Sequence, residues 1–231
     1  MNKAICLFVF KSPLVKNGII EKEEDNYYID LAIKNIKTYK SYPVDILVLT
    51  DSPEEFKDLN VIIVLYTEVD KSYTDKLLIC EIALKKYETI LYIDSDITLN
   101  IDNFCEAKFN PGIYYTEDWL EIPLIYQEFK NIIKDDYFDH IENHCKKNNL
   151  KINDAKLIGE RFFVISRDEK LNDFFKIFNC LKKEINNNDV KFNNKPLGRG
   201  EGLIIGISIL NSGVPLYKTN DLKQDLYFIH E

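Results

Sequence analysis

The sequence predicts an α/β fold in which helices flank a mostly parallel β-sheet. Short, continuous apolar runs alternate with helical patterns through the first hundred residues, and two of these runs end at aspartates. Runs without alternating polar positions indicate strands that are buried on both faces, as in a parallel sheet covered by helices. Ligands of such sheets bind at the carboxyl ends of the strands, so the aspartates mark a candidate site.

The first half contains four expected strands and two expected helices. Residues 4–10 predict a buried strand because they are apolar throughout, and a polar loop is expected from there to Asp25. Residues 27–39 predict an amphipathic helix, with apolar residues recurring on one face. The remaining elements are a helix that begins after Thr74 or Asp75 and reaches about residue 86, and strands at residues 45–50, 61–65 and 89–93.

The second half is less regular. Its expected strands are residues 113–116 and 162–165, and its expected helices are a polar stretch within 119–149 and residues 168–185 and 201–210. Residues 186–195 are expected to form a polar loop. The chain of 231 residues shows no internal repeat and no clear boundary, so residues 1–231 are predicted to form a single domain.

Charge and cysteine content exclude several classes of protein. A net charge of −8 argues against a nucleic-acid groove and means that a diphosphate ligand requires a bridging cation. The five cysteines are odd in number and scattered, without a CxxC pair, which favours a reducing compartment. Lys11 interrupts the apolar run of residues 4–10 too early for a signal peptide, and no segment reaches the length of a membrane span. The expected location is the cytoplasm.

Asp94, Ser95 and Asp96 follow the strand at residues 89–93 and form the main candidate site. Two carboxylates at positions i and i+2 after a buried strand can both face the crevice at the sheet edge. Oxygen ligands suit a hard cation such as Mn²⁺ or Mg²⁺, which leaves coordination positions open for phosphates. An Asp-x-Asp pair alone is a weak signal, and its position at a strand end in an α/β pattern strengthens it considerably.

Three segments resemble one family in the same order. Residues 74–80, 87–97 and 99–104 resemble the glycogenin-like enzymes of glycosyltransferase family eight. That resemblance implies a GT-A fold, a Rossmann-like mostly parallel sheet. It also implies the transfer of a hexose from a UDP-sugar, with Mn²⁺ or Mg²⁺ as cofactor and retention of the anomeric configuration. Residues 1–118 would then be the nucleotide-sugar-binding half and residues 119–231 the acceptor-side half.

The resemblance also assigns roles to individual residues. Asp94 and Asp96 would hold the metal, Ser95 would line the donor site, and Lys76 would contact the sugar or the diphosphate. Phe10 and Lys11 end the first strand where the family binds the base. A lysine at the start of a helix is otherwise often a solvated surface residue, which is the alternative interpretation of Lys76.

The carboxyl-terminal half departs from the family pattern at several points. His230 matches the histidine that closes the family's metal site, although a terminal histidine is also commonly disordered. The lysine that follows this histidine in the family is absent, because the sequence ends at Glu231. Glu201 stands where relatives carry the Gln of an Asp-Gln-Gly segment and would act on the acceptor side. A helix-start acid favoured by the helix dipole is the alternative for Glu201.

Two other functions fit parts of the sequence. A catalytically degenerate domain of the same fold, binding nucleotide or a partner, is consistent with the altered segments. Asp94-Ser-Asp-Ile-Thr98 also fits the opening motif of haloacid-dehalogenase-type phosphatases, with Asp94 as nucleophile and Asp96 as general acid. His140 and His144 are four residues apart, so they share one face of the expected helix. A solvated helix face is a better interpretation of this pair than a zinc site. The sequence does not distinguish between a glycan, a protein and a lipid as the acceptor.

Overall fold

The computed structural model of the protein describes residues 2–16, 19–67, 75–115, 136–156, 158–159, 161–186, 191–192, 195–196 and 201–218. These residues form two compact units, which are described separately. Unit 1 consists of the described residues of Met1–Asn110 together with Arg161–Ser166, and unit 2 consists of those of Pro111–Glu160 and Arg167–Lys218. The predicted single domain with halves that meet near residue 118 stays a prediction.

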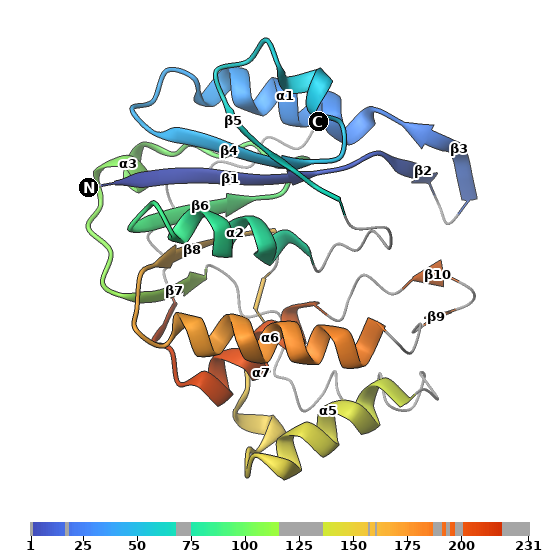
Figure 1. The fold of residues 1–231 in the computed structure, drawn as a ribbon, viewed down its shortest axis with the longest axis vertical. Helices are drawn as coiled ribbons and strands as arrows, with labels where there is room; N and C mark the ends of the chain where they lie inside the picture. The colour runs from blue at the N-terminus through green and yellow to red at the C-terminus, as the bar shows by residue number, and fades with distance from the viewer. Residues whose placement is uncertain are drawn as a thin grey trace. The chain divides into compact units, whose positions relative to one another are not determined.

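Unit 1 is built on strands that follow one another in the order β8, β6, β1, β4, β5 (Figure 1). β1 pairs in parallel with β4 and β6, β4 pairs in parallel with β5, and β8 pairs antiparallel with β6. The strands are β1 (Lys3–Val9), β4 (Asp45–Thr50), β5 (Ile62–Leu65), β6 (Thr89–Ile93) and β8 (Phe162–Ser166). Every residue of β1, β6 and β8 is buried, which explains their continuous apolar sequences.

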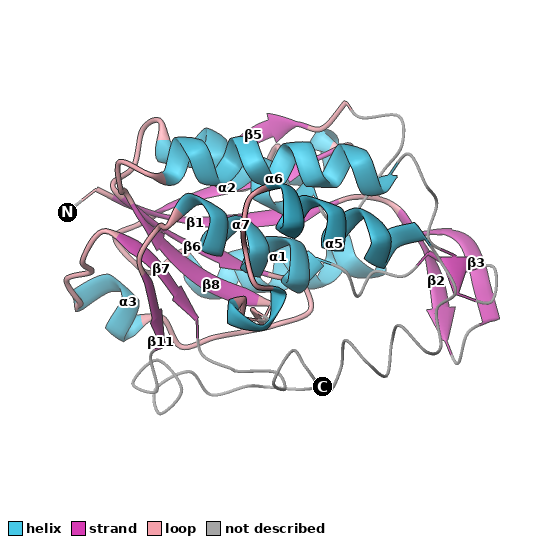
Figure 2. Ribbon diagram, turned by 90° about the horizontal axis from the view of Figure 1, so that it is seen from below, coloured by secondary structure: helices cyan, strands magenta, loops and turns pink. Residues whose placement is uncertain are grey.

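Helices cover both faces of this sheet. α1 (Tyr27–Tyr39) connects β1 to β4, whereas α2 (Lys76–Leu84) lies between β5 and β6 in the sequence and crosses back over the sheet. Because right-handed connections that run in opposite directions place their helices on opposite faces, α1 and α2 lie on the two sides of the strands (Figure 2). The fold is therefore α/β with a mostly parallel sheet flanked by helices, as the sequence predicts.

One expectation for unit 1 was wrong. The segment after β1 was expected to be a polar loop through Asp25, and it instead forms an antiparallel hairpin of β2 (Ser12–Lys16) and β3 (Ile19–Asp25). The remaining elements of unit 1 are short: a 3₁₀ turn at Pro53–Phe56 and α3 (Asp102–Glu106). Backbone pairing between the two hairpin strands satisfies the polar groups of a segment whose side chains are largely charged.

Unit 2 contains three packed helices and short strands. α6 (Leu171–Asn186) packs against both α5 (Asp136–Lys147) and α7 (Glu201–Ser212). The strands are β7 (Gly112–Tyr115), β9 (Lys191–Phe192), β10 (Lys195–Pro196) and β11 (Leu216–Lys218), and a 3₁₀ turn covers Ile152–Asp154. β7 and β11 are parallel, and β9 and β10 are antiparallel. Among the described helices, none combines the length and apolar composition that crossing a membrane requires.

Candidate active site at the carboxyl edge of the sheet

The parallel strands of unit 1 bring several predicted residues to one edge of the sheet. Because β1, β4 and β6 run in the same direction, their carboxyl ends meet at this edge. Phe10 and Lys11 follow β1, Asp51 follows β4, and residues 94–96 follow β6. Lys76 joins them as the first residue of α2, which contacts β1, β4 and β6.

Asp94 is tied to the fold through both its backbone and its side chain. Its backbone N–H donates to the carbonyl oxygen of Arg161 at 2.7 Å. Its Oδ1 accepts a hydrogen bond from the Tyr92 hydroxyl at 2.7 Å and lies 3.4 Å from Lys76 Nζ. The carboxylate is 26% exposed, so it is held on one side by these partners and open to the site on the other.

Lys76 is buried, which rules out its interpretation as a solvated surface residue. Only 5% of the residue is exposed, and its ammonium lies 5.6 Å from the centre of the Tyr92 ring. That ring stacks on Phe163 of β8 with 5.0 Å between the ring centres. The ammonium is therefore held between an aromatic face and the Asp94 carboxylate, two environments that stabilise a desolvated cation.

A buried asparagine holds the turn that carries the two aspartates. Asn35 of α1 donates from Nδ2 to the carbonyl oxygens of Ser95 at 2.9 Å and Ile97 at 2.7 Å. Its Oδ1 accepts a hydrogen bond from the Thr98 hydroxyl. Sequence reasoning missed Asn35, although a polar residue within the apolar face of α1 is a signal. Ser95 itself is 7% exposed, so the donor site can reach little of its side chain.

Asp96 differs from Asp94 in its surroundings. It is exposed and makes no hydrogen bond or ion pair with any residue that the structure describes. An exposed carboxylate beside a partly exposed one supplies oxygen ligands suited to Mn²⁺ or Mg²⁺. No cluster of three or more His, Cys, Asp or Glu side chains occurs among the described residues, so a cation here would need further ligands from elsewhere.

The ends of β1 and β4 are linked by a carboxylate. Asp51 Oδ1 accepts hydrogen bonds from the Lys11 backbone N–H at 3.2 Å and from the Ser52 hydroxyl at 2.9 Å. The Phe10 ring lies 6.2 Å from that of Tyr66, with both measured between ring centres. These contacts place Phe10 and the Lys11 backbone at the sheet edge, where the resemblance puts the base.

The start of α2 is fixed by Asp75 and by Tyr66, which sequence reasoning missed. The Tyr66 hydroxyl donates to Asp75 Oδ2 at 2.5 Å, and both residues are almost fully buried. The Tyr66 backbone N–H also donates to the carbonyl oxygen of Thr50 at 2.8 Å. Thr74 or Asp75 was expected to cap α2, and the Asp75 carboxylate makes no capping hydrogen bond and binds Tyr66. This bond ties the residue before Lys76 to the end of β5.

A thiol on α2 takes no part in this chemistry. Cys80 lies one turn after Lys76 and is fully buried. Burial raises the pKa of the Cys80 thiol well above its usual value, and the nearby Lys76 charge only partly opposes this. The thiol is therefore protonated at neutral pH and is not a nucleophile.

Two other predicted site residues are not placed relative to this edge of the sheet. Glu201 is the first residue of α7 in unit 2, and its expected role on the acceptor side stays a prediction. His230 falls outside the described residues, so its expected role as a metal ligand also stays a prediction.

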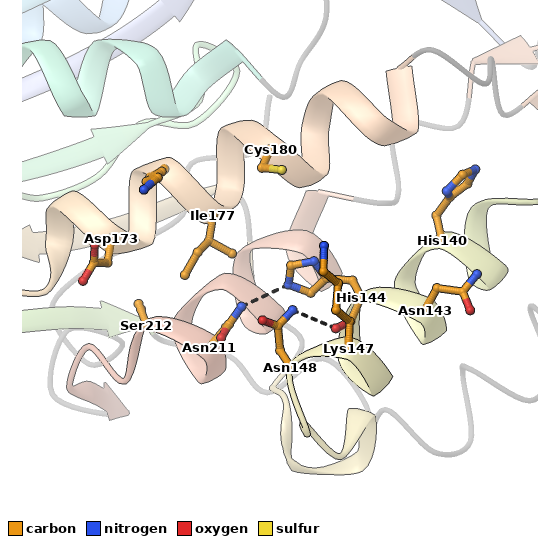
Figure 3. Close-up of a pocket in the computed structure, with 11 residues that line it drawn as sticks. His140, Asn143, His144, Lys147, Asn148, Asp173, Ile177, Cys180, Asn211 and Ser212 are labelled. Carbon is orange, nitrogen blue, oxygen red and sulfur yellow. Dashed lines mark hydrogen bonds between the residues drawn. The ribbon is translucent and has the colours of Figure 1, made fainter.

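The histidines of α5 are not on a freely solvated helix face. His140 and His144 are both half-buried, and His144 Nε2 lies 3.0 Å from Nδ2 of Asn211 on α7. Together they border a pocket of 560 Å³ in unit 2, between α5, α6 and α7 (Figure 3). The expectation of a solvated face was wrong for His144, because α7 supplies a partner that the sequence of α5 alone cannot reveal.

Comparisons with known proteins give fold likenesses only. A scan against protein-family models and a search of curated proteins found no match to this sequence. Among solved structures, the galactosyltransferase LgtC in complex with donor and acceptor sugar analogues has a TM-score of 0.49 and 12% identity, with 92% of this chain and 72% of that chain covered. An active-site mutant of LgtC has a TM-score of 0.47, 12% identity and coverage of 88% and 69%.

A third solved structure is the mannosyltransferase PcManGT from Pyrobaculum calidifontis in complex with GDP-Man and Mn²⁺. Its TM-score is 0.45 and its identity 11%, and the likeness covers 96% of this chain and 55% of that chain. All three structures are glycosyltransferases. At these values a likeness carries no conclusion about what this chain binds or catalyses.

Proposed function

We propose that the protein is a glycosyltransferase that transfers a hexose from a UDP-sugar, with retention, to a glycan, protein or lipid acceptor. The observation that carries this proposal is the convergence of Asp94, Asp96 and the buried Lys76 at the carboxyl edge of a parallel sheet. A reducing compartment such as the cytoplasm is part of the same proposal, because the five cysteines form no disulfide in the described part of the chain.

The charges of this site suit a diphosphate only when a cation is present. Lys76 balances Asp94 at 3.4 Å, which leaves the exposed Asp96 as the uncompensated charge of the three. The resulting negative charge repels a diphosphate in a protein whose net charge is already −8. A divalent cation at Asp96 and Asp94 reverses the local sign, and this predicts that cation and nucleotide bind together.

The residues of the chain have separate roles in this proposal. Asp96 and Asp94 hold Mn²⁺ or Mg²⁺, which when bound neutralises the departing nucleoside diphosphate. Lys76 adds a buried positive charge beside the diphosphate, the kind of fixed electrostatic interaction that often dominates catalysis. His230 would complete the metal site, and Glu201 would act on the acceptor hydroxyl.

Recognition of the nucleotide is assigned to the neighbouring strand end. Phe10 offers an aromatic face, and the backbone of Lys11, anchored by Asp51, offers hydrogen-bonding groups to the base. Ser95 contributes through the turn held by Asn35. The hydrogen bonds from Asn35 fix the backbone that carries both carboxylates before the donor arrives, which lowers the cost of binding.

Thermal unfolding with UDP and Mn²⁺, added separately and together, tests the proposal on the wild type and on Asp96→Asn. A ligand at a hundred times its dissociation constant stabilises by about 2.7 kcal/mol, which is about 5–10 °C for a chain of this size. We expect this shift only when both are present, and we expect Asp96→Asn to lose it. Asp58→Asn, an exposed aspartate of unit 1 outside the site, is the matched control and should keep the shift.

The other outcomes separate the alternatives. A response to Mg²⁺ with phosphate mimics but none to UDP would favour a phosphatase in which Asp94 is the nucleophile. A shift with UDP and Mn²⁺ but no release of UDP from any UDP-hexose would favour a degenerate, nucleotide-binding domain. Release of UDP that Asp96→Asn abolishes, followed by NMR of the product's anomeric proton, tests transfer and its stereochemistry.

A further inference from the structure

We propose that unit 2 carries a second ligand site, a pocket between α5, α6 and α7 that binds a sugar bearing a phosphate or a carboxylate. The pocket has a volume of 560 Å³ and is lined by residues of unit 2 alone. None of them belongs to the Asp-Ser-Asp site, so this inference does not depend on the transfer reaction.

The lining of the pocket selects a polar ligand. Pockets of about 300–1,000 Å³ hold small molecules, and most of these are lined by apolar and aromatic side chains. Seven of its eleven lining residues carry an amide, ammonium or imidazole group, and Ile177 is its one large aliphatic side chain. Figure 3 shows Asn211 of α7 beside His144 and Asn148, at the end of α5. Such groups bind hydroxyls through hydrogen bonds, and the apolar part of the lining can contact the C–H groups of a ring, so a sugar fits this lining.

The charges on the rim of the pocket favour an anion. Lys147 from α5 and Lys176 from α6 are exposed, and neither makes a hydrogen bond or ion pair with a described residue. Asp173 is the one carboxylate among the lining residues. In a protein of net charge −8, two lysines and two histidines around one carboxylate form a local excess of cationic and hydrogen-bonding groups. Charge-assisted hydrogen bonds from lysine to phosphate or carboxylate are the strongest that these side chains can make.

Two hydrogen bonds order amide side chains of the pocket lining in advance. Asn211 Nδ2 lies 3.0 Å from His144 Nε2, which joins the end of α7 to α5. Asn148 Nδ2 donates to the carbonyl oxygen of His144 at 2.9 Å. Both amides are thereby oriented, and their carbonyl oxygens can accept hydrogen bonds from sugar hydroxyls. Ordering these side chains before binding reduces the entropy lost when the ligand arrives.

A metal ion explains the pocket less well than an anionic sugar. His140, His144, Cys180 and Asp173 all border it, and such side chains can ligate zinc. No set of three such groups in the described part of the chain is placed to hold a metal. His144 Nε2 is moreover already engaged by Asn211.

Calorimetric titration of the full chain without divalent cations tests the site. The probes are glucose 6-phosphate, glucuronate, inorganic phosphate and glucose. We expect saturable binding of at least one of the two acidic sugars with a dissociation constant of about 1 mM or tighter. Phosphate and glucose should each bind at least about tenfold more weakly, because each lacks one half of the contacts. Comparing the two acidic sugars identifies which anionic group the lysines prefer.

Variants then locate the binding. The double variant Lys147→Gln, Lys176→Gln should weaken the acidic sugar by about tenfold or more, and circular dichroism should show an unchanged fold. Lys146→Gln, Lys183→Gln removes two exposed lysines of the same helices that do not line the pocket, and it should bind like the wild type.

Several results would overturn the proposal. These are an absence of saturable binding by both acidic sugars, equal affinity for glucose or for inorganic phosphate, and equal losses in the two double variants. The measurement is a binding constant in the absence of metal, so its outcome is independent of whether the Asp-Ser-Asp site binds UDP.

Discussion

Replacing Lys76 with methionine tests whether burial gives the Lys76–Asp94 ion pair its strength. Unit 1 contains a second lysine–aspartate pair, Lys86–Asp45. The distance from the lysine nitrogen to the carboxylate oxygen is 3.5 Å in this pair and 3.4 Å in Lys76–Asp94. Each lysine also lies over a tyrosine ring whose hydroxyl donates to the same carboxylate. The side chains of Lys76 and Asp94 are 6% and 26% exposed, whereas those of Lys86 and Asp45 are 61% and 53% exposed.

The expected magnitude for the buried pair follows from its distance and burial. At 3.4 Å and an effective dielectric constant of about 20, the attraction between unit charges is about 5 kcal/mol. Desolvation of the buried ammonium offsets several kcal/mol of this attraction. We therefore expect a coupling of about 1–2 kcal/mol in a double-mutant cycle of Lys76→Met and Asp94→Asn. Lys76→Met alone should lower the free energy of unfolding by about 2 kcal/mol. The loss is moderate because the Asp94 carboxylate keeps its hydrogen bond from Tyr92 and its partial exposure to water.

The exposed pair is the matched control. A cycle of Lys86→Met and Asp45→Asn should show no measurable coupling, because water and salt screen exposed charges. Urea unfolding followed by far-UV circular dichroism, at low and at high salt, gives both coupling energies. High salt should leave the Lys76–Asp94 coupling largely unchanged. Equal couplings in the two cycles, or an unchanged urea midpoint in Lys76→Met, would refute the reasoning that burial sets the strength.

The remaining predictions concern buried groups and close packing. Burial raises the pKa of Tyr39 to about 12 and also raises that of the Cys6 thiol, so both groups stay protonated in the folded chain after they ionise in the unfolded one. The folded state then binds more protons than the unfolded state, and the buried Cys80 thiol contributes in the same way. The free energy of unfolding should therefore fall above about pH 8.5 through Cys6 and Cys80, and further above about pH 10 through Tyr39. Cys6→Ala should make the first part of this fall shallower in a urea-unfolding pH series. A Cβ at Gly206 would lie 1.8 Å from the carbonyl oxygen of Lys156, so Gly206→Ala should cost about 3 kcal/mol or more in unfolding free energy. Gly213→Ala meets only backbone strain at φ +67°, so its loss of thermal stability should be clearly smaller.

Much of unit 1 is predictable because its strands are buried on both faces. Continuous apolar runs and one-sided helices are direct consequences of a covered parallel sheet, and β4 and α1 have the boundaries that the sequence predicts. The hairpin β2–β3 was missed because its second strand is highly charged. Asn17-Gly18 lies between the two strands in the sequence, and this pair favours tight hairpin turns, so the signal was present.

The candidate site is only partly predictable for a different reason. Asp94 and Asp96 are marked by the strand that precedes them, which is local information. The partners that hold them are distant in sequence: Lys76 is 18 residues from Asp94, and Asn35 is 60 residues from Ser95. Whether a lysine at the start of a helix is solvated or buried depends on which strands that helix crosses, and sequence periodicity does not contain this information.

The same limit applies to α5. Its amphipathic pattern predicts which face is polar, and it does not predict which other helix meets that face. Asn211, the partner of His144, lies 67 residues further along the chain. Polar faces that border a pocket and polar faces in water have the same sequence pattern, so only the packing of α5, α6 and α7 distinguishes them.

The two lysine–tyrosine–aspartate groups lie at opposite edges of the same sheet. Asp45 begins β4 and Tyr87 precedes β6, so the exposed group is at the amino edge, whereas Asp94 follows β6 at the carboxyl edge. The group at the carboxyl edge includes Lys76, the first residue of α2. The positive end of the α2 dipole therefore adds to the positive charge at this edge and not at the amino edge.

This difference connects stability to the proposed function. Lys76 is stable in its buried position because Asp94 balances its charge. A cation that binds Asp94 weakens that balance, and the Lys76 ammonium then gains most from a new anionic partner such as a diphosphate. Metal alone is therefore expected to bind weakly, nucleotide alone is repelled, and each should raise the affinity of the other by the same factor. In Lys76→Met this reciprocal coupling should shrink although both aspartates remain, and isothermal titration of Mn²⁺ with and without UDP measures it directly.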